Sequence, residues 1–232
     1  MTEFRVDLPA GGSVGARRYA PTRDGGWATL VLAHGAGASQ THPFLVAFAQ
    51  AFAARGIETV TFNFPYMEAR RRIPDRTPVL EACYLAVIAA IRGGLGLGAA
   101  RPGTGPLFIG GKSMGGRMAS HVAAHHAEAA GALAGLVFLG YPLHPPGKPE
   151  QRRDAHLPLV AAPMLFVQGT RDAFGTSAEL GPVLAGLGAR AAILPVPDGD
   201  HSFGVPRISG RTSAAVHEEM QDAIVAWMRK AA

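Results

Sequence analysis

Short apolar runs alternate with longer helical stretches along most of the chain. Each run is followed by glycine or proline and then by a stretch with helical periodicity; examples are TLVLAHG, TVTFNF, PLFIGG and MLFVQG. Runs with no polar alternation are typical of strands buried on both faces, as in parallel sheets whose strands are joined through helices. The pattern predicts an α/β fold, with a mainly parallel twisted sheet and helices on both faces.

The first twenty residues have a different pattern. Residues 4–8 and 14–21 are predicted to form two strands joined by the glycine turn AGGS, which makes a leading hairpin. The length of 232 residues suits one core, so we expect a single domain, 1–232. The glycine-rich stretch GGLGLGAARPGTG is read as a loop within it. Residues 144–162 have room for only a short helix, so no large lid is expected.

Composition places the chain among compact globular proteins, with 48% hydrophobic and 17% charged residues. The formal charge of +5 comes mostly from scattered arginines, whereas nucleic-acid binders gather them on one face. We therefore expect no nucleic-acid partner. Arg70, Arg71, Arg72 and Arg76 form one local cluster in a predicted loop, which is either a solvated surface run or a contact for an anionic substrate.

The single cysteine and the lack of a long apolar segment bear on location. Cys83 lies in the apolar run LEACYLAVIAAI, so it is read as a buried residue, and no intrachain disulfide is possible. The longest apolar stretch falls short of the roughly 20 residues that a membrane span needs, and the start of the chain does not resemble a signal peptide. The expectation is a soluble cytoplasmic protein with no membrane partner.

The stretch IGGKSMGGRM has two competing interpretations. A phosphate-binding loop, G-x-x-x-x-G-K-S, requires glycine five residues before Gly111, but that position is Pro106. The residues before Gly111 also form a predicted strand rather than a flexible loop. Nucleotide binding is therefore not favoured.

The alternative is a nucleophile elbow, G-x-S-x-G, formed by Gly111, Ser113 and Gly115. In such an elbow a serine sits on a sharp turn between a strand and a helix, and flanking glycines avoid a clash with neighbouring backbone. An apolar strand precedes this motif and a helical stretch follows it. Lys112 is interpreted as a packing or surface residue of the turn.

A serine nucleophile needs a base and an acid that orients the base. Asp172 and His201 each follow a predicted strand, so in a parallel sheet they share an edge with Ser113. The chain order serine, acid, histidine is that of α/β-hydrolases. Asp198 and Asp200 are rival acids, but residues so close to His201 in sequence seldom reach its ring nitrogen with good geometry.

An oxyanion hole needs two N–H donors. The backbone N–H groups of Met114, directly after the serine, and of Ala36, in the glycine-rich loop HGAG, are the candidates. Phe174 and Phe203 follow the acid and the base, and are candidates for the substrate pocket; core positions are the alternative for both.

Nine histidines raise the question of a metal site. His121 and His125 are an i, i+4 pair on a predicted helix, next to His126, but a zinc site requires a further ligand. We interpret these histidines as a solvated helix face and expect no metal and no cofactor. His34 is read either as orienting the oxyanion loop or as a structural residue.

Six motifs, in order across nearly the whole chain, carry a resemblance to a known family: HGAG, FNFPYME, GGKSMGGR, GYPLHPPGKPE, LFVQGTRDAFG and GDHSF. The chain resembles small bacterial α/β-hydrolases of the dienelactone-hydrolase-like group, whose relatives include a subunit of a eukaryotic chromatin-acetylation complex. The resemblance implies a lidless hydrolase with Ser113, Asp172 and His201 as its triad. Dienelactone hydrolases proper use a cysteine nucleophile, so their substrate does not carry over.

The leading hypothesis is a serine hydrolase that cleaves a small-molecule ester or thioester through an acyl-enzyme. Two alternatives stay open. One is a non-catalytic interaction module that keeps the fold, as the eukaryotic relatives suggest. The other is a thioesterase for anionic acyl thioesters, which rests on the arginines at positions 70–76.

Overall fold

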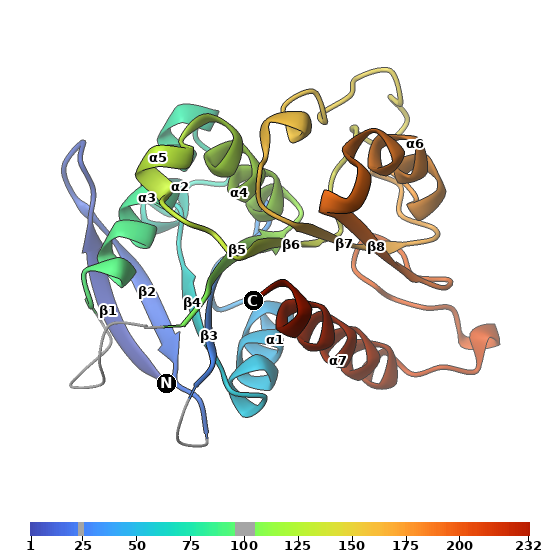
Figure 1. The fold of residues 1–232 in the computed structure, drawn as a ribbon, viewed down its shortest axis with the longest axis horizontal. Coiled ribbons are helices and arrows are strands. Elements are labelled where there is room, and N and C mark those ends of the chain that lie inside the picture. Colours follow the sequence, from blue (N-terminus) through green and yellow to red (C-terminus); the bar gives the residue numbers. More distant parts are fainter. Residues whose placement is uncertain (23–25, 96–104) are drawn as a thin grey trace.

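One eight-stranded sheet runs through the computed structural model, which describes residues 1–22, 26–95 and 105–232. The strand order is β1-β2-β4-β3-β5-β6-β7-β8 (Figure 1); β2 is antiparallel to both of its neighbours, β1 and β4, and all the other neighbouring strands are parallel. The strands are β1 (Thr2–Asp7), β2 (Ser13–Tyr19), β3 (Ala28–Ala33), β4 (Ile57–Phe62), β5 (Leu107–Lys112), β6 (Gly135–Leu139), β7 (Met164–Gly169) and β8 (Ala191–Val196). The predicted hairpin and mainly parallel sheet are confirmed.

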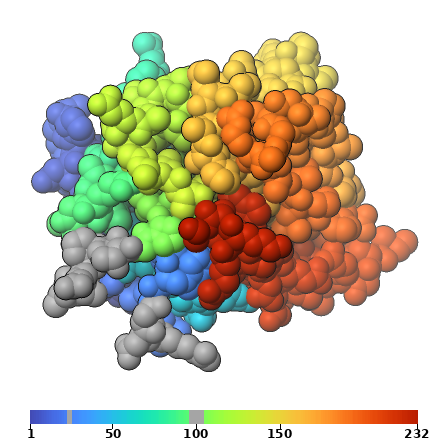
Figure 2. Space-filling model, in the orientation of Figure 1, coloured from blue at the N-terminus to red at the C-terminus, as the bar shows by residue number. Residues whose placement is uncertain are grey.

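Helices cover both faces of this sheet, as the sequence predicts. In Figure 1, α3, α4 and α6 lie on one side and α1 and α7 on the other. The helices are α1 (Pro43–Ala54), α2 (Pro65–Glu68), α3 (Thr77–Arg92), α4 (Met114–His125), α5 (Ala127–Ala130), α6 (Ser177–Leu187) and α7 (Ser213–Ala231), with short 3₁₀ turns η1 (Leu157–Leu159), η2 (Gly188–Arg190) and η3 (Arg207–Ser209). Figure 2 shows the C-terminal helix packed against the body of the molecule.

The central strand β3 shows why the apolar runs are continuous. Leu30 and Leu32 belong to the hydrophobic cluster that includes α1 and α7, whereas Val31 and Ala33 belong to the cluster on the side of α3 and α4. All four are fully buried. Because successive side chains of a strand point to opposite faces, a strand covered on both sides needs apolar residues at every position.

The connections agree with the sequence analysis where they are described. Residues 144–162 contain only the 3₁₀ turn η1, so the expectation of a short helix and no large lid is confirmed. The predicted glycine-rich loop before β5 falls mostly on residues 96–104, outside the described residues. Among the helices of the described part, none is both long and apolar enough to cross a membrane.

Candidate active site

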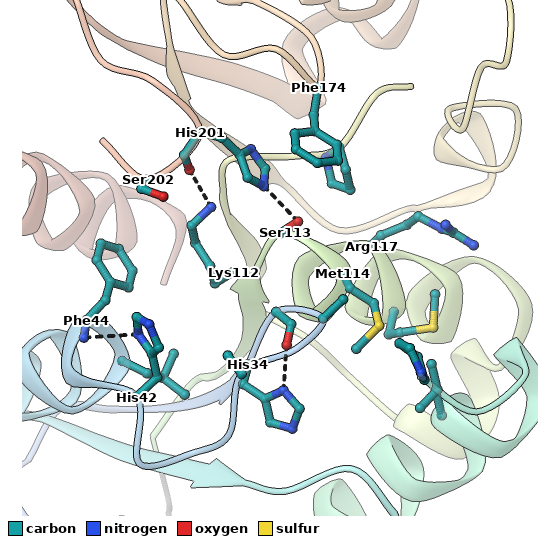
Figure 3. Close-up of a pocket in the computed structure, with 18 of the residues that line it drawn as sticks. His34, His42, Phe44, Lys112, Ser113, Met114, Arg117, Phe174, His201 and Ser202 are labelled. Atoms are coloured by element: carbon teal, nitrogen blue, oxygen red, sulfur yellow. Dashed lines mark hydrogen bonds between the residues drawn. The ribbon is translucent and has the colours of Figure 1, made fainter. Parts of the chain in front are cut away.

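Ser113 occupies a sharp turn between β5 and α4. Its backbone angles are φ 50° and ψ −117°, which a residue with a side chain adopts only under strain. The turn reverses the chain at the carboxyl end of the strand and holds the hydroxyl in the cavity beside the sheet (Figure 3). This is the geometry of a nucleophile elbow.

The flanking glycines are required because neighbouring backbone is too close for a side chain. A Cβ at Gly111 would lie 2.6 Å from the carbonyl oxygen of Ala33, and one at Gly115 would lie 2.5 Å from the same atom. Both distances are far below van der Waals contact. The G-x-S-x-G spacing therefore lets β5 and α4 meet tightly against the end of β3.

Ser113, His201 and Asp172 are joined by hydrogen bonds. The Oγ of Ser113 lies 2.9 Å from Nε2 of His201 (Figure 3). Nδ1 of His201 lies 2.8 Å from Oδ2 of Asp172. The three residues follow β5, β8 and β7, which are parallel strands of one sheet, so their carboxyl ends lie along the same edge. The side chains that sequence reasoning selected are thus brought together, and neither Asp198 nor Asp200 takes the place of Asp172.

The carboxylate of Asp172 is buried and held by further donors. Its Oδ2 accepts a hydrogen bond from Nε2 of Gln168 at 2.9 Å, and its Oδ1 accepts one from the N–H of Phe174 at 2.8 Å. Asp172 is only 1% exposed. Sequence reasoning missed Gln168, although a polar residue inside the apolar strand MLFVQG was a signal. These donors fix the carboxylate so that it can orient the ring of His201.

Lys112 is half-buried at the end of β5, which fits the interpretation as a packing residue of the turn, but the sequence did not indicate its hydrogen-bond partner. Its Nζ donates a hydrogen bond to the backbone oxygen of His201 at 2.6 Å. Burial lowers the pKa of Lys112 to about 8, partly offset by the carboxylates of Asp172 and Asp200. The lysine ties the loop that carries His201 to the end of β5.

The two expected oxyanion donors flank Ser113 at the cavity wall. Ala36 and Met114 both line the cavity, and within the described residues neither backbone N–H donates a hydrogen bond to another group. His34 holds the loop before Ala36, since its Nδ1–H donates to the oxygen of Gly35 at 2.8 Å and its Nε2 accepts from the N–H of Phe64 at 3.1 Å. Burial lowers the pKa of His34 to about 4, so the ring is neutral at pH 7.

The cavity in which Ser113 and His201 lie has a volume of about 830 Å³, enough for a small molecule. Phe174 lines it and packs against the His201 ring, with 4.2 Å between the ring centroids. Phe203 does not line it. The left-handed backbone of Phe203, φ 64°, is accompanied by a fully buried side chain that stacks on Phe44, so the pocket assignment of Phe203 is corrected to a core position.

The arginine cluster at positions 70–76 lies outside the cavity wall. Arg70, Arg71, Arg72 and Arg76 are exposed, and Arg71 pairs with Asp75 at 2.6 Å. None of the four arginines lines the cavity. The surface-run interpretation fits this placement better than contact with an anionic substrate.

A second serine–histidine pair lies inside the protein, between Ser120 on α4 and His156 directly before η1. Ser120 Oγ is 2.7 Å from Nε2 of His156 and also donates to the oxygen of Arg117 at 2.7 Å. Because the single hydroxyl proton goes to Arg117, Nε2 of His156 must carry its own proton and cannot act as a base. Ser120 is fully buried and does not line the cavity. This pair is therefore structural.

Next to this pair, α3 and α4 gather several titratable side chains. Donor atoms of Glu81, His121 and His125 lie within 4.8 Å of one another, and this is the group in the described residues that could hold a cation. Glu81 accepts hydrogen bonds from His121 at 3.0 Å and from His126 at 3.2 Å. The expectation of a solvated helix face is wrong for His121, because α3 packs on it and supplies the carboxylate.

Comparisons with known proteins agree with this geometry. A family model described as an alpha/beta hydrolase domain matches residues 26–229. The structure is similar to a lidless α/β serine hydrolase from Xanthomonas campestris, with a TM-score of 0.71 and 20% identity over 97% of this chain and 94% of that one. It is also similar to an α/β serine hydrolase homologue from Coxiella burnetii, with a TM-score of 0.72 and 16% identity over 97% and 96% of the two chains.

A dienelactone hydrolase from Anabaena variabilis has a TM-score of 0.66 and 19% identity, over 95% of each chain. Identities this low establish a common fold and no more. The family model, in contrast, covers almost the entire sequence, including the strand ends that carry Ser113, Asp172 and His201. The protein therefore belongs to the alpha/beta hydrolase domain family.

Proposed function

We propose that this protein is a serine hydrolase that cleaves a small-molecule ester or thioester through an acyl-enzyme. The observation that carries the proposal is the hydrogen-bonded chain from Ser113 through His201 to Asp172, at the wall of a cavity of about 830 Å³. A strained serine on an elbow, a base within hydrogen-bond reach and a buried carboxylate behind the base are the parts that acyl transfer needs.

In the first half-reaction, the Oγ of Ser113 attacks the carbonyl carbon while its proton moves to Nε2 of His201. The C–O or C–S bond then breaks, and the leaving alkoxide or thiolate takes that proton from His201. Asp172 accepts the Nδ1–H bond throughout, so it holds the ring and stabilises the imidazolium. The products are a free alcohol or thiol and an ester of Ser113.

In the second half-reaction, water gives a proton to Nε2 of His201 and attacks the acyl carbon. Collapse of this intermediate returns the proton to Oγ of Ser113 and releases the carboxylic acid. The N–H groups of Ala36 and Met114 are proposed to bind the oxyanion in both halves, because both line the cavity beside Ser113. One such donor is typically worth about 3 kcal/mol in the transition state.

The proposal is tested with a fluorophosphonate probe and with 4-nitrophenyl acetate. Wild-type protein should be labelled at Ser113 and should hydrolyse the ester, whereas Ser113→Ala should do neither. Ser202→Ala is the matched control, because Ser202 lines the same cavity and, within the described residues, its hydroxyl forms no hydrogen bond with His201 or Asp172. Labelling that survives in folded Ser113→Ala would exclude this serine as the nucleophile.

The non-catalytic interaction module is the rival outcome of the same experiment. Folded wild-type protein that neither reacts with the probe nor hydrolyses any ester would favour the module. The relation to the chromatin-complex subunit and the cytoplasmic location both stay predictions. The hydrolase is preferred because a binding scaffold has no need of a strained serine aligned with His201 and Asp172.

A further inference from the structure

Two arginines line the cavity without a carboxylate partner. Lys112, Arg117 and Arg153 are the lining cations, and Lys112 is accounted for by its bond to the His201 backbone. Among the described residues, neither Arg117 nor Arg153 has an acidic group within ion-pair distance. In the described part of the chain, Asp75 is the carboxylate that lines the cavity, and it already pairs with Arg71.

Arg117 is fixed close to the proposed nucleophile. It lies one turn of α4 after Ser113, and residues four apart occupy the same helix face. Figure 3 shows it on the opposite side of Ser113 from Phe44 and His42, so the cavity extends to both sides of the serine. Its Nε is buried and has no hydrogen-bond partner.

Arg153 comes from the segment between β6 and β7, and its backbone is held in place. Its N–H donates to the oxygen of Leu143 at 2.9 Å, and its own oxygen accepts from the hydroxyl of Tyr141 at 2.7 Å. Its side chain is half-buried in the cavity wall. The fold thus places a second guanidinium group on the same wall as Arg117.

Arg117 and Arg153 carry like charges on the lining of one cavity, so their guanidinium groups repel each other. Burial lowers the pKa of Arg117, and the nearby charge of Arg153 lowers it further. Glu81 attracts Arg117 at longer range, but its two oxygens are engaged by His121 and His126. Keeping a half-buried cation without a partner costs stability, and an anion bound between the two groups would remove that cost.

We propose that Arg117 and Arg153 form an anion-binding subsite, and that the preferred ester or thioester carries a carboxylate or phosphate that binds there. This inference rests on the proposed hydrolase function and names its substrate class. Guanidinium groups match planar or tetrahedral oxyanions through paired N–H donors, which makes them suited to this recognition. The anion would thus bind at the cavity wall rather than at the exposed arginines at positions 70–76.

The kinetic test compares two esters of the same acyl length, mono-4-nitrophenyl adipate and 4-nitrophenyl hexanoate. Wild-type protein should prefer the charged ester in kcat/KM. Arg117→Gln and Arg153→Gln should each reduce the ratio of the two kcat/KM values about tenfold or more, mainly through the KM of adipate, because each variant loses hydrogen bonds to a charged group. Arg72→Gln, an exposed arginine, is the matched control and should leave the ratio unchanged.

A binding test separates the subsite from the chemistry. Calorimetry on folded Ser113→Ala should detect monomethyl adipate and not methyl hexanoate, and butyl phosphate should compete if the site accepts either oxyanion. Losing the Arg153 guanidinium in Ser113→Ala/Arg153→Gln should weaken adipate binding by a similar factor. If the charged and neutral ligands bind alike, or if both arginine variants keep the wild-type ratio, the subsite is excluded. Adipate binding without any ester hydrolysis would instead retain the subsite and reject the hydrolase.

Discussion

Two serine–histidine pairs of nearly equal length lie in very different surroundings within the part of the chain that the structure describes. Ser113 and His201 are 2.9 Å apart at the cavity wall, and Ser120 and His156 are 2.7 Å apart inside the protein. The first serine ends a strand with a left-handed backbone, while the second lies in the middle of α4. Distance alone therefore does not distinguish a reactive pair from a structural one.

Three physical differences distinguish them. The Nδ1 of His201 is bound to a buried carboxylate, which leaves Nε2 free to accept the serine proton. In the other pair the hydroxyl proton is directed to a backbone oxygen, so His156 is the donor. Finally, a substrate can reach Ser113 from the cavity, whereas Ser120 is fully buried. Access and proton position decide which pair can perform chemistry.

The largest expected effect comes from removing the histidine of each pair. His201→Gln should lower kcat for 4-nitrophenyl acetate by about 10⁴-fold or more, because the general base is lost. His156→Gln should leave kcat within about fivefold. It should instead lower the melting temperature, because the buried contact between His156 and Ser120 of α4 is disturbed. Steady-state kinetics and thermal unfolding of both variants measure this. Equal losses of kcat in two folded variants would contradict the assignment.

A smaller effect is expected from Gln168, which holds the carboxylate of Asp172. Gln168→Leu should lower kcat roughly ten- to hundredfold with little change in KM, because one hydrogen bond to a charged group is worth about 1.5–3 kcal/mol. Gln221→Leu, at a buried glutamine of α7, is the matched control and should keep the wild-type kcat. If the two glutamine variants lose the same activity, Gln168 has no special role behind Asp172.

Lys112 should have a more modest influence, because it acts only on the backbone that carries His201. Lys112→Met keeps most of the apolar side-chain stem and removes the donor to the His201 oxygen, so kcat should fall roughly tenfold. Amide hydrogen exchange in residues 198–204 should become faster at the same time. Lys148→Met, at an exposed lysine, is the control. A drop in kcat without faster exchange would argue against a positioning role.

The smallest expected effect is a loss of stability at acid pH. It comes from His156 of the second pair and from His121, whose ring lies against that of His156. Burial lowers the pKa of His121 and of His156 from 6.5 to about 4. The folded state therefore resists protonation more than the unfolded state, so the stability contributed by the neutral rings is complete above pH 6.5 and is lost as the pH falls towards 4. Urea unfolding at pH 7.5 and at pH 5 should show that the free energy of unfolding falls less in His156→Gln than in wild type. An identical fall in both proteins would show that His156 does not cause the loss of stability at acid pH.

Much of the site could be predicted from the sequence because local rules carry it. The elbow needs glycine where Gly111 and Gly115 approach backbone too closely for a Cβ, and chain order placed Asp172 and His201 at the ends of later strands. Phe203 could not be assigned in this way. In the sequence, a place directly after the base is compatible with a pocket residue or a core residue, and the packing on Phe44 places the side chain in the core.

By itself, the sequence determined the α/β architecture, the elbow and the identity of the three hydrogen-bonded residues, since periodicity and strand-end position are local properties. Only the tertiary structure decided which further side chains surround these three residues and line the cavity. Gln168 reaches Asp172 by its position in β7, Glu81 reaches His121 because α3 packs on α4, and Arg153 joins Arg117 at the cavity wall. Such contacts depend on helix packing and loop paths, which are set by the whole core rather than by any short segment.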